Sequence, residues 1–374
     1  MKINKLHLYD FRNHSNLLLE FKSNYNIFYG RNAEGKTNIV EAIYALNFSK
    51  SHRTNKDSDL IKMGSDFARI GAIVENGERK KKLQLMFSNK GKKAFINNKN
   101  LDKLTDFINN LNIVFFAPEH LQIIKGSPST RRKYLDMFIA QLSNSYLSLL
   151  SDYNVVLKQR NEYLKMMMIN GYSDKTYFDI LTEKLVDLAL KIYKVRLNYV
   201  EMLSNSTSHY FKTIFESKNL TFKYDFSFEI INNDIKSSLE KVYRDNFRRE
   251  MQQGSTKYGP HRDDFSFFID SKNAKDFGSQ GQQRLIILNL KLAEIDLFKK
   301  EKGYYPILVL DDVLSEIDKE NQIKFLKSIN RSIQTFITTT DKQFLSNPFF
   351  EGADCFLVKD SIVKLITRGE DSVD

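Results

Sequence analysis

The segment that most constrains this chain is Gly30-Arg31-Asn32-Ala33-Glu34-Gly35-Lys36-Thr37, which fits the pattern G-x-x-x-x-G-K-[ST]. Residues 26–29 before it have the pattern of a strand, and residues 37–48 after it place apolar side chains at helical spacing. Glycines in such a turn let backbone N–H groups converge on phosphate oxygens, and the helix N-terminus adds positive potential. The sequence therefore predicts an α/β fold with a phosphate-binding loop; the alternative is a chance glycine-rich turn. We expect Lys36 to neutralise the β- and γ-phosphates of ATP and Thr37 to bind Mg²⁺.

A second segment supplies the acids that such a site needs. Pro306-Ile307-Leu308-Val309-Leu310-Asp311-Asp312 reads as a strand buried on both faces that ends in two carboxylates. We expect Asp311 to hold Mg²⁺ through water, and Asp312 to orient or deprotonate the attacking water. Lys36 and Asp312 are thus the predicted catalytic residues, and Thr37 and Asp311 the predicted metal ligands. A buried strand followed by a helix-capping aspartate is the alternative.

A third segment, Ser279-Gln280-Gly281-Gln282-Gln283-Arg284, opens a predicted helix over 285–300. Serine and glycine at a helix N-terminus form another anion site. The phosphate-binding loop already occupies one side of the nucleotide, so a second such turn has no role within one subunit. We expect Ser279, Gly281 and Gln282 to contact the γ-phosphate held by a second copy of the chain. The alternative is that Ser279 is an ordinary N-cap.

The middle of the chain has a different pattern, with apolar residues recurring at three- and four-residue steps over about 131–165 and again over 181–199. Two helices joined by the short loop 170–174 should pack antiparallel. A first helix continuous over 131–165 would be about 50 Å long. The predicted organisation is a head formed by residues 1–118 and 253–374, with a helical arm inserted at 119–252.

Composition narrows the classes of function. One cysteine, Cys355, rules out a disulfide framework, and no apolar run approaches the roughly 18 residues of a membrane helix, so we expect a cytoplasmic protein. The net charge of +11 and a pI near 9.3 favour a polyanionic partner such as DNA. A generally lysine-rich composition would explain the same charge.

Several further motifs carry a family resemblance. Ser279–Gln283 is similar to the ABC signature, and Ser315-Glu316-Ile317-Asp318 is similar to the D-loop of that superfamily. In addition, the chain resembles the RecF family of bacterial recombination mediators, over essentially its whole length and in the right order, at Tyr9–His14, Phe116–Glu119, Gly126–Arg132 and Tyr258–Asp264.

The resemblance implies a P-loop ABC-type, SMC-like ATPase head with a short helical second domain. It implies a homodimer that forms on ATP, binds duplex DNA and single-strand/double-strand junctions, and hydrolyses ATP slowly in response to DNA. It further implies cooperation with RecR and RecO in loading RecA at gaps and stalled forks, next to the nucleoid and without a membrane. Ser315 and Asp318 would be the D-loop residues. The ATP-binding residues would be Arg12, Gly30, Arg31, Asn32, Ala33, Glu34, Gly35, Lys36, Thr37 and Asn38.

The sequence departs from the general ABC pattern in two places. Asp312 replaces the usual glutamate, and a shorter carboxylate further from the water is consistent with slow turnover. The usual switch histidine is absent where a strand over 334–337 ends in Thr338-Thr339-Thr340-Asp341. A threonine could hydrogen-bond the γ-phosphate but does not titrate near neutrality. Gln122 is one candidate for the Q-loop.

Residues for DNA are less clearly marked. The predicted contacts are clusters at the two ends of one expected hairpin, Lys80, Lys81 and Lys82 at one end and Lys92 and Lys93 at the other. The alternative is an edge strand protected by lysine. Other cationic residues each allow two interpretations. Arg244, Arg248 and Arg249 share a helical face and are either DNA contacts or a solvated surface, and Arg131 and Arg132 are either DNA contacts or structural residues. His52 and Arg53 either sense nucleotide or cap a helix.

Two rival functions remain open. A soluble ATPase subunit of a transporter would have a shorter spacing between the phosphate-binding loop and the signature, whereas here a large insertion separates Thr37 from Ser279. A non-hydrolysing ATP switch is the other rival, and Asp312 argues against it.

Overall fold

The computed structural model describes residues 1–170, 175–215 and 219–366. The chain forms two compact units, one made of residues 1–120 and 291–374 and the other of residues 121–290. The arm was expected to end at residue 252, but the second unit extends to Leu290. The reason is that β10 (Asp264–Ile269) pairs along its whole length with β9 (Leu220–Asp225), which belongs to that unit.

The first unit contains a mostly parallel sheet in the order β15-β14-β3-β13-β12-β8. Its parallel pairs are β14/β3, β3/β13, β13/β12 and β12/β8, and β15 pairs antiparallel with β14. Parallel strands end at one edge, so the segments that follow β3, β12 and β13 meet there. The strands are β3 (Tyr25–Tyr29), β8 (Ile113–Phe116), β12 (Ile307–Asp311), β13 (Thr335–Thr339), β14 (Asp354–Lys359) and β15 (Ile362–Ile366).

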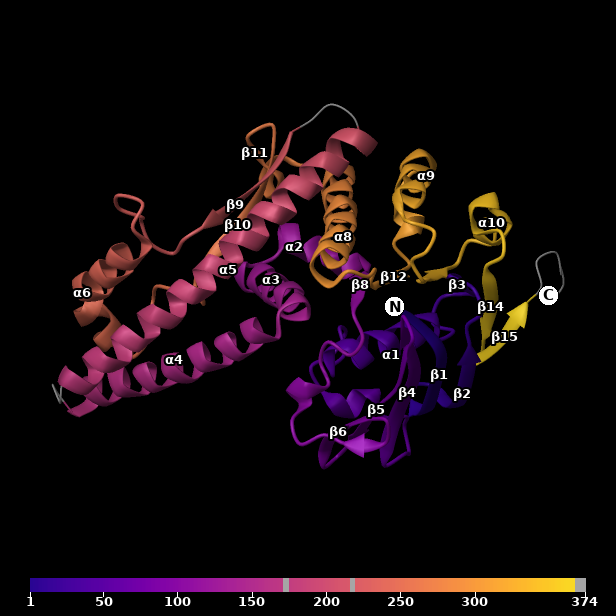
Figure 1. Cartoon of the computed structure of the whole chain (residues 1–374), viewed down its shortest axis with the longest axis horizontal. Helices are drawn as coiled ribbons and strands as arrows, with labels where there is room; N and C mark the ends of the chain where they lie inside the picture. Colours follow the sequence, from indigo (N-terminus) through magenta and orange to yellow (C-terminus); the bar gives the residue numbers. More distant parts are fainter. Residues whose placement is uncertain (171–174, 216–218, 367–374) are drawn as a thin grey trace. The chain divides into compact units, whose positions relative to one another are not determined.

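A second, antiparallel sheet of the same unit has the order β2-β1-β4-β5-β6-β7. Its strands are β1 (Lys2–Phe11), β2 (His14–Glu20), β4 (Phe67–Asn76), β5 (Arg79–Ser88), β6 (Gly91–Ile96) and β7 (Lys99–Asn100). Helix α1 (Lys36–Phe48) contacts strands of both sheets (Figure 1), and most of its side chains are buried. A helix buried on nearly all sides needs apolar residues around its circumference, which explains why its sequence is apolar beyond a single stripe.

Short helices complete this unit: η1 (Asp57–Leu60), η2 (Leu104–Asp106), η3 (Pro118–Leu121), η4 (Leu314–Glu316), α9 (Lys319–Ser328), α10 (Gln343–Ser346) and η5 (Pro348–Phe350). Helix α8 (Gln280–Lys302) carries the chain from the second unit back into the first.

The second unit is built on long helices. Figure 1 shows α4 (Asn144–Asn170) and α5 (Lys175–Phe215) side by side and antiparallel, as the sequence predicted. Most of their predicted loop, residues 171–174, lies outside the described residues. The unit also contains α2 (Gln122–Lys125), α3 (Pro128–Leu142), α6 (Ile235–Gln253), α7 (Ala274–Phe277) and the sheet β11-β10-β9, with β11 at Lys272–Asn273.

The first apolar stripe of the arm is not one continuous helix. Ser143 adopts extended backbone angles (φ −138°, ψ 109°) and separates α3 from α4. Its Oγ accepts a hydrogen bond from the backbone N–H of Tyr146 at 3.2 Å, which caps the start of α4. The apolar stripe over 131–165 therefore spans two helices, and the helical spacing of apolar residues continues across the break between them.

Within the described residues, no helix combines the length and the apolar character that crossing a membrane would need.

Candidate nucleotide site

The glycine-rich loop after β3 closes around the ammonium group of Lys36. Lys36 is buried and its Nζ donates to the carbonyl oxygens of Gly30 and Arg31, both at 2.7 Å. Ala33 (φ 68°) and Gly35 (φ 108°) have left-handed backbone angles, which turn successive N–H groups inward. A Cβ on Gly35 would lie 2.6 Å from Asn13 Nδ2, so this position requires glycine. The loop therefore has the form predicted from the sequence.

The charge balance at this loop fits a phosphate ligand. Burial lowers the pKa of Lys36, and the nearby carboxylates of Asp312, Asp311 and Glu34 oppose that shift. Glu34 also accepts a hydrogen bond from the backbone N–H of Asp360, which fixes the outer side of the loop.

Asp311 lies at the centre of a hydrogen-bond network at the edge of the parallel sheet. Its Oδ1 accepts from Thr37 Oγ1 at 3.1 Å and from Thr338 Oγ1 at 2.7 Å. Thr338 Oγ1 in turn accepts from the backbone N–H of Asp312 at 2.9 Å. Burial raises the pKa of Asp311, and the hydrogen bonds from Thr338 and Thr37 lower it. Two strands and one helix thus contribute to the network: β12 supplies Asp311, β13 supplies Thr338, and α1, which follows β3 and the loop, supplies Thr37.

The two oxygens predicted to hold Mg²⁺ lie within hydrogen-bond distance of each other. Mg²⁺ prefers hard oxygen ligands and is usually held by one or two carboxylates together with substrate phosphates, so Thr37 and Asp311 fit this ion. No group of three or more His, Cys, Asp or Glu residues suited to a metal occurs among the residues that the structure describes.

Asp312, the predicted catalytic base, has a left-handed backbone conformation (φ 51°). The hydroxyl of Ser315, one of the D-loop residues, donates to the carbonyl oxygen of Asp312 at 2.9 Å and to its Oδ1 at 3.2 Å. Asp318, the other D-loop residue, caps α9 by accepting from the backbone N–H of Asn321 at 3.0 Å. The D-loop thus contacts the acid pair directly through Ser315.

The turn that contains Arg12 packs against the phosphate-binding loop, since the atom nearest to a Cβ added at Gly35 would belong to Asn13. Asn13 Oδ1 also accepts from Asn38 Nδ2 at 2.7 Å, which ties the turn to the first turn of α1. Arg12 Nη1 donates to the carbonyl oxygen of Asp59 at 2.7 Å. The structure therefore brings Arg12 and Asn38 to the loop, as the family resemblance implied.

The sequence analysis missed Glu41, which anchors Arg12. Its carboxylate is fully buried in α1 and accepts from Arg12 Nε at 2.8 Å and from Arg12 Nη2 at 2.6 Å. Arg53 Nη1 lies 3.6 Å from Glu41 and donates to Asn38 Oδ1 at 3.0 Å. An acid in an otherwise apolar helix directly after a phosphate-binding loop was the available signal.

His52 does not cap α1, since the C-cap of that helix is Ser49. Its ring packs against Tyr44 and Phe115, with centroid distances of 5.1 Å and 4.5 Å. Burial lowers the pKa of His52 to about 4, so the ring is neutral at physiological pH. His52 is therefore a packing residue in this structure, whereas Arg53 contacts the α1 residues beside the loop.

The signature segment forms a reciprocal capping box at the start of α8. Ser279 Oγ accepts from the backbone N–H of Gln282 at 3.2 Å, and Gln282 Oε1 accepts from the backbone N–H of Ser279 at 3.0 Å. Gly281 is exposed, and a Cβ added there would meet nothing closer than Ser279 Oγ at 3.9 Å. Packing within the described chain therefore does not explain a glycine at this position.

The lysine clusters expected to bind DNA lie at opposite ends of the β5–β6 hairpin, which the structure forms as predicted. Lys80 is 3.5 Å from Glu75, Lys81 donates to Asn110 at 2.8 Å, and Lys92 is 3.1 Å from Asp57. Lys82 and Lys93 are exposed. Three of these five side chains thus have local partners, so their contact with DNA stays a prediction.

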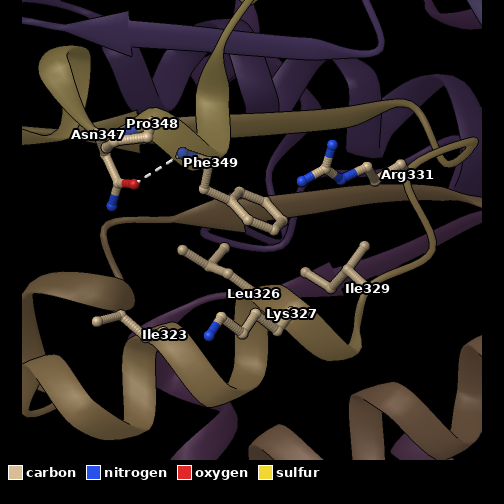
Figure 2. A pocket seen from close by; sticks show the side chains of 8 residues that line it. All are labelled: Ile323, Leu326, Lys327, Ile329, Arg331, Asn347, Pro348 and Phe349. Atoms are coloured by element: carbon tan, nitrogen blue, oxygen red, sulfur yellow. Dashed lines mark hydrogen bonds between the residues drawn. The ribbon is translucent and has the colours of Figure 1, made fainter.

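A separate pocket of the first unit contains none of the predicted site residues. It has a volume of about 410 Å³, and Figure 2 shows its apolar walls with two cationic side chains at the edge. It is lined by Ile323, Leu326, Lys327, Ile329, Arg331, Asn347, Pro348 and Phe349.

Comparison with known proteins settles the family. A family profile described as "RecF/RecN/SMC N terminal domain" matches residues 2–355. A DNA replication and repair protein RecF from Pediococcus pentosaceus is 42% identical over 348 residues, covering 91% of this chain and 92% of the relative. The chain belongs to the RecF family. A RecF protein from Bacillus pumilus is 41% identical over 363 residues, covering 96% of this chain and 98% of its own.

Solved structures give the same assignment. One described as the recombination mediator protein RecF with ATP in the RecFOR pathway superposes with a TM-score of 0.89 at 33% identity, covering 98% of this chain and 97% of the other. An Smc head domain superposes with a TM-score of 0.57 at 16% identity, which shows the shared fold. The fold is therefore that of the ABC-type, SMC-like ATPase head, and RecF proteins of this family bind ATP. These full-length matches favour DNA repair over the transporter alternative.

Proposed function

We propose that this chain is an ATP-dependent DNA-binding clamp of recombinational repair. One observation supports the proposal most directly. The hydroxyls of Thr37 and Thr338 both donate to one carboxylate oxygen of Asp311, beside the buried ammonium group of Lys36. This arrangement supports the proposal, because the ammonium group proposed to bind phosphate, the two oxygens proposed to hold Mg²⁺ and the acid Asp312 lie at one sheet edge. The names of the relatives support the assignment to DNA repair.

In the proposed reaction, Lys36 exchanges its two backbone carbonyl partners for phosphate oxygens of ATP. Thr37 and Asp311 would hold Mg²⁺, which supplies positive charge that offsets the phosphate charge. Asp312 orients the attacking water, and Ser315 holds the carboxylate of Asp312 in place. The aspartate carboxylate is one methylene shorter than that of glutamate, which is consistent with slow hydrolysis.

The proposed dimer uses the signature residues in trans. Ser279, Gly281 and Gln282 lie at the N-terminus of α8, where backbone N–H groups and the helix dipole favour an anion. The open space around Gly281 is consistent with close approach of a second copy that carries nucleotide. The capping box gives Ser279 and Gln282 a second role within one chain, that of capping α8.

The proposed DNA ligands are duplexes and single-strand/double-strand junctions, and the net charge of +11 favours them. By analogy with a relative described as part of the RecFOR pathway, the partners would be RecR and RecO, and the outcome would be loading of RecA at gaps and stalled forks in the cytoplasm.

ATP turnover with and without gapped duplex DNA tests the proposal, using wild type and Ser279→Arg. An arginine at this exposed position should block a dimer closed on nucleotide but leave the phosphate-binding loop intact. We expect DNA to stimulate the wild type and not the variant, while both bind ATP equally. A rate that is indifferent both to DNA and to the substitution would contradict the clamp and the signature in trans.

A further inference from the structure

Two motifs that the nucleotide site does not use meet at one cavity in the second unit. Residues 126–132 open α3, and residues 258–264 precede β10. The cavity between them has a volume of about 340 Å³, within the usual range for ligand pockets. Ser129, Arg132 and Lys133 line it from α3, and Pro260 and His261 line it from the second motif.

The adjacent arginines at the start of α3 have different environments. Arg131 is buried and donates to both carboxylate oxygens of Asp264, from Nε at 2.6 Å and from Nη2 at 2.7 Å. Arg132 lines the cavity and donates from Nη1 to the backbone carbonyl of Asp263 at 2.6 Å. Arg131 therefore has a structural role, whereas Arg132 forms no ion pair with any residue that the structure describes.

The carboxylates around the cavity are already bound to other groups. Asp264 is paired with Arg131, and Lys133, like Arg132, forms no ion pair among the described residues. Asp263 accepts hydrogen bonds from the hydroxyl of Tyr224 at 3.0 Å and the backbone N–H of Ser227 at 2.7 Å. Asp136 forms an ion pair with Arg196 at 2.8 Å and accepts from the hydroxyl of Tyr146 at 2.6 Å. Arg132 and Lys133 thus face a cavity whose lining carboxylate, Asp136, is paired with Arg196, and neither cation forms an ion pair with a residue that the structure describes.

The local electrostatics favour an anion. Burial lowers the pKa of Arg132, and the positive charges of Arg196 and Arg262 act in the same direction against the opposing effect of Asp264 and Asp263. His261 adds no charge, because burial lowers its pKa to about 4 and its ring nitrogens contact the hydroxyl of Tyr153 at 2.7 Å and the carbonyl of Thr256 at 3.2 Å. A bound anion would relieve the repulsion among the arginines.

The donors at the cavity match a phosphate group. A guanidinium presents a planar fork of N–H donors, and a lysine ammonium acts as a point charge. The hydroxyl of Ser129 and the amide of Asn154 supply neutral donors at the same cavity. Half or more of the hydrogen bonds in protein–DNA complexes go to phosphate and sugar from these residue types.

We propose that this cavity binds a phosphate group of a DNA strand through Arg132 and Lys133, assisted by Ser129 and Asn154. The proposal rests on the proposed DNA binding and locates one contact of it on the second unit. A phosphate is favoured over a carboxylate of a partner protein because the chain carries a net charge of +11, which suits a polyanion.

The test measures DNA affinity by fluorescence anisotropy with a labelled gapped duplex, in ATP and Mg²⁺, at several salt concentrations. The variants are Lys133→Gln, Arg132→Gln and the double substitution. Lys184→Gln is the matched control, since it removes one exposed cation of α5 that does not line the cavity. If a cation contacts a phosphate, its removal should reduce the steepness of the plot of log binding constant against log salt concentration by about 1. The reduction should be equal for AT-rich and GC-rich duplexes.

The outcomes separate this inference from the proposed function. Failure of the wild type to bind DNA would contradict the proposed function itself. If the wild type binds DNA normally and the salt slope is unchanged in Lys133→Gln and in the double variant, only the proposed phosphate site in the cavity is refuted. A defect confined to binding of a partner protein would refute that site as well. Lys133 forms no ion pair with any described residue, so its variant remains informative if Arg132→Gln fails to fold.

A duplex with and without a 5′-phosphate identifies the source of the phosphate. A defect confined to the phosphorylated duplex would support a strand terminus as the ligand. An equal defect with both duplexes would support an internal phosphodiester.

Discussion

Thr338→Val tests whether β13 holds the acid pair of the nucleotide site. The substitution keeps the shape of the side chain and removes the hydroxyl that donates to Asp311 at 2.7 Å and accepts from the N–H of Asp312 at 2.9 Å. A hydrogen bond to a charged group contributes about 1.5–3 kcal/mol, and a neutral one about 1 kcal/mol. We therefore expect the free energy of unfolding to fall by about 2–4 kcal/mol, measured by urea denaturation at pH 7.

The sign of the pH dependence follows from the pKa of Asp311, which burial raises above its unfolded value. The folded state then binds the proton more tightly, so the contribution of Asp311 to stability falls as pH rises through its folded pKa. Loss of the Thr338 hydrogen bond should raise that pKa further. The stability difference between variant and wild type should therefore be larger at pH 7 than at pH 4.

A neighbouring threonine provides the control. Thr335 is also buried in β13, but its hydroxyl donates to the backbone carbonyl of Ile333 at 3.3 Å rather than to a carboxylate. Thr335→Val should lack the pH-dependent part of the effect and should leave ATP turnover near the wild-type rate, whereas Thr338→Val should reduce it. Equal behaviour of the two variants in both assays would refute the role given to Thr338.

Two further predictions address the same unit. Asp312→Asn should lower ATP turnover by about 10²–10⁴-fold, as expected for loss of a general base. The ATP-bound dimer of this variant should persist in sedimentation velocity, and rapid turnover would show that Asp312 is not the base. Glu41→Gln should lower the free energy of unfolding in urea by about 3–5 kcal/mol, because it leaves the Arg12 guanidinium without its buried partner. The control Glu20→Gln removes an exposed ion pair with Lys5 and should change that free energy little. Similar losses for both glutamates would show that burial of the Arg12 pair does not matter.

Contiguous motifs were readable from the sequence, because their chemistry depends on neighbouring residues. The loop from Gly30 to Thr37 forms as predicted, and α1 begins at Lys36. The strand ending in Asp311 and the antiparallel pairing of α4 and α5 also follow local patterns of apolar residues. Ser143 shows the limit of such patterns, since a single extended residue interrupts the helix without disturbing the apolar spacing.

The sequence by itself therefore determined the phosphate-binding loop, the paired acids, the signature segment and the family. Only the tertiary structure decided which distant residues serve them. Thr338 reaches Asp311 because β13 lies between β3 and β12, and strand order is not encoded in any local pattern. The different roles of Arg131 and Arg132 likewise depend on where the carboxylate of Asp264 lies, 133 residues from Arg131 along the chain. Long-range contacts of this kind arise from packing, so a linear pattern can name the candidate residues but not pair them.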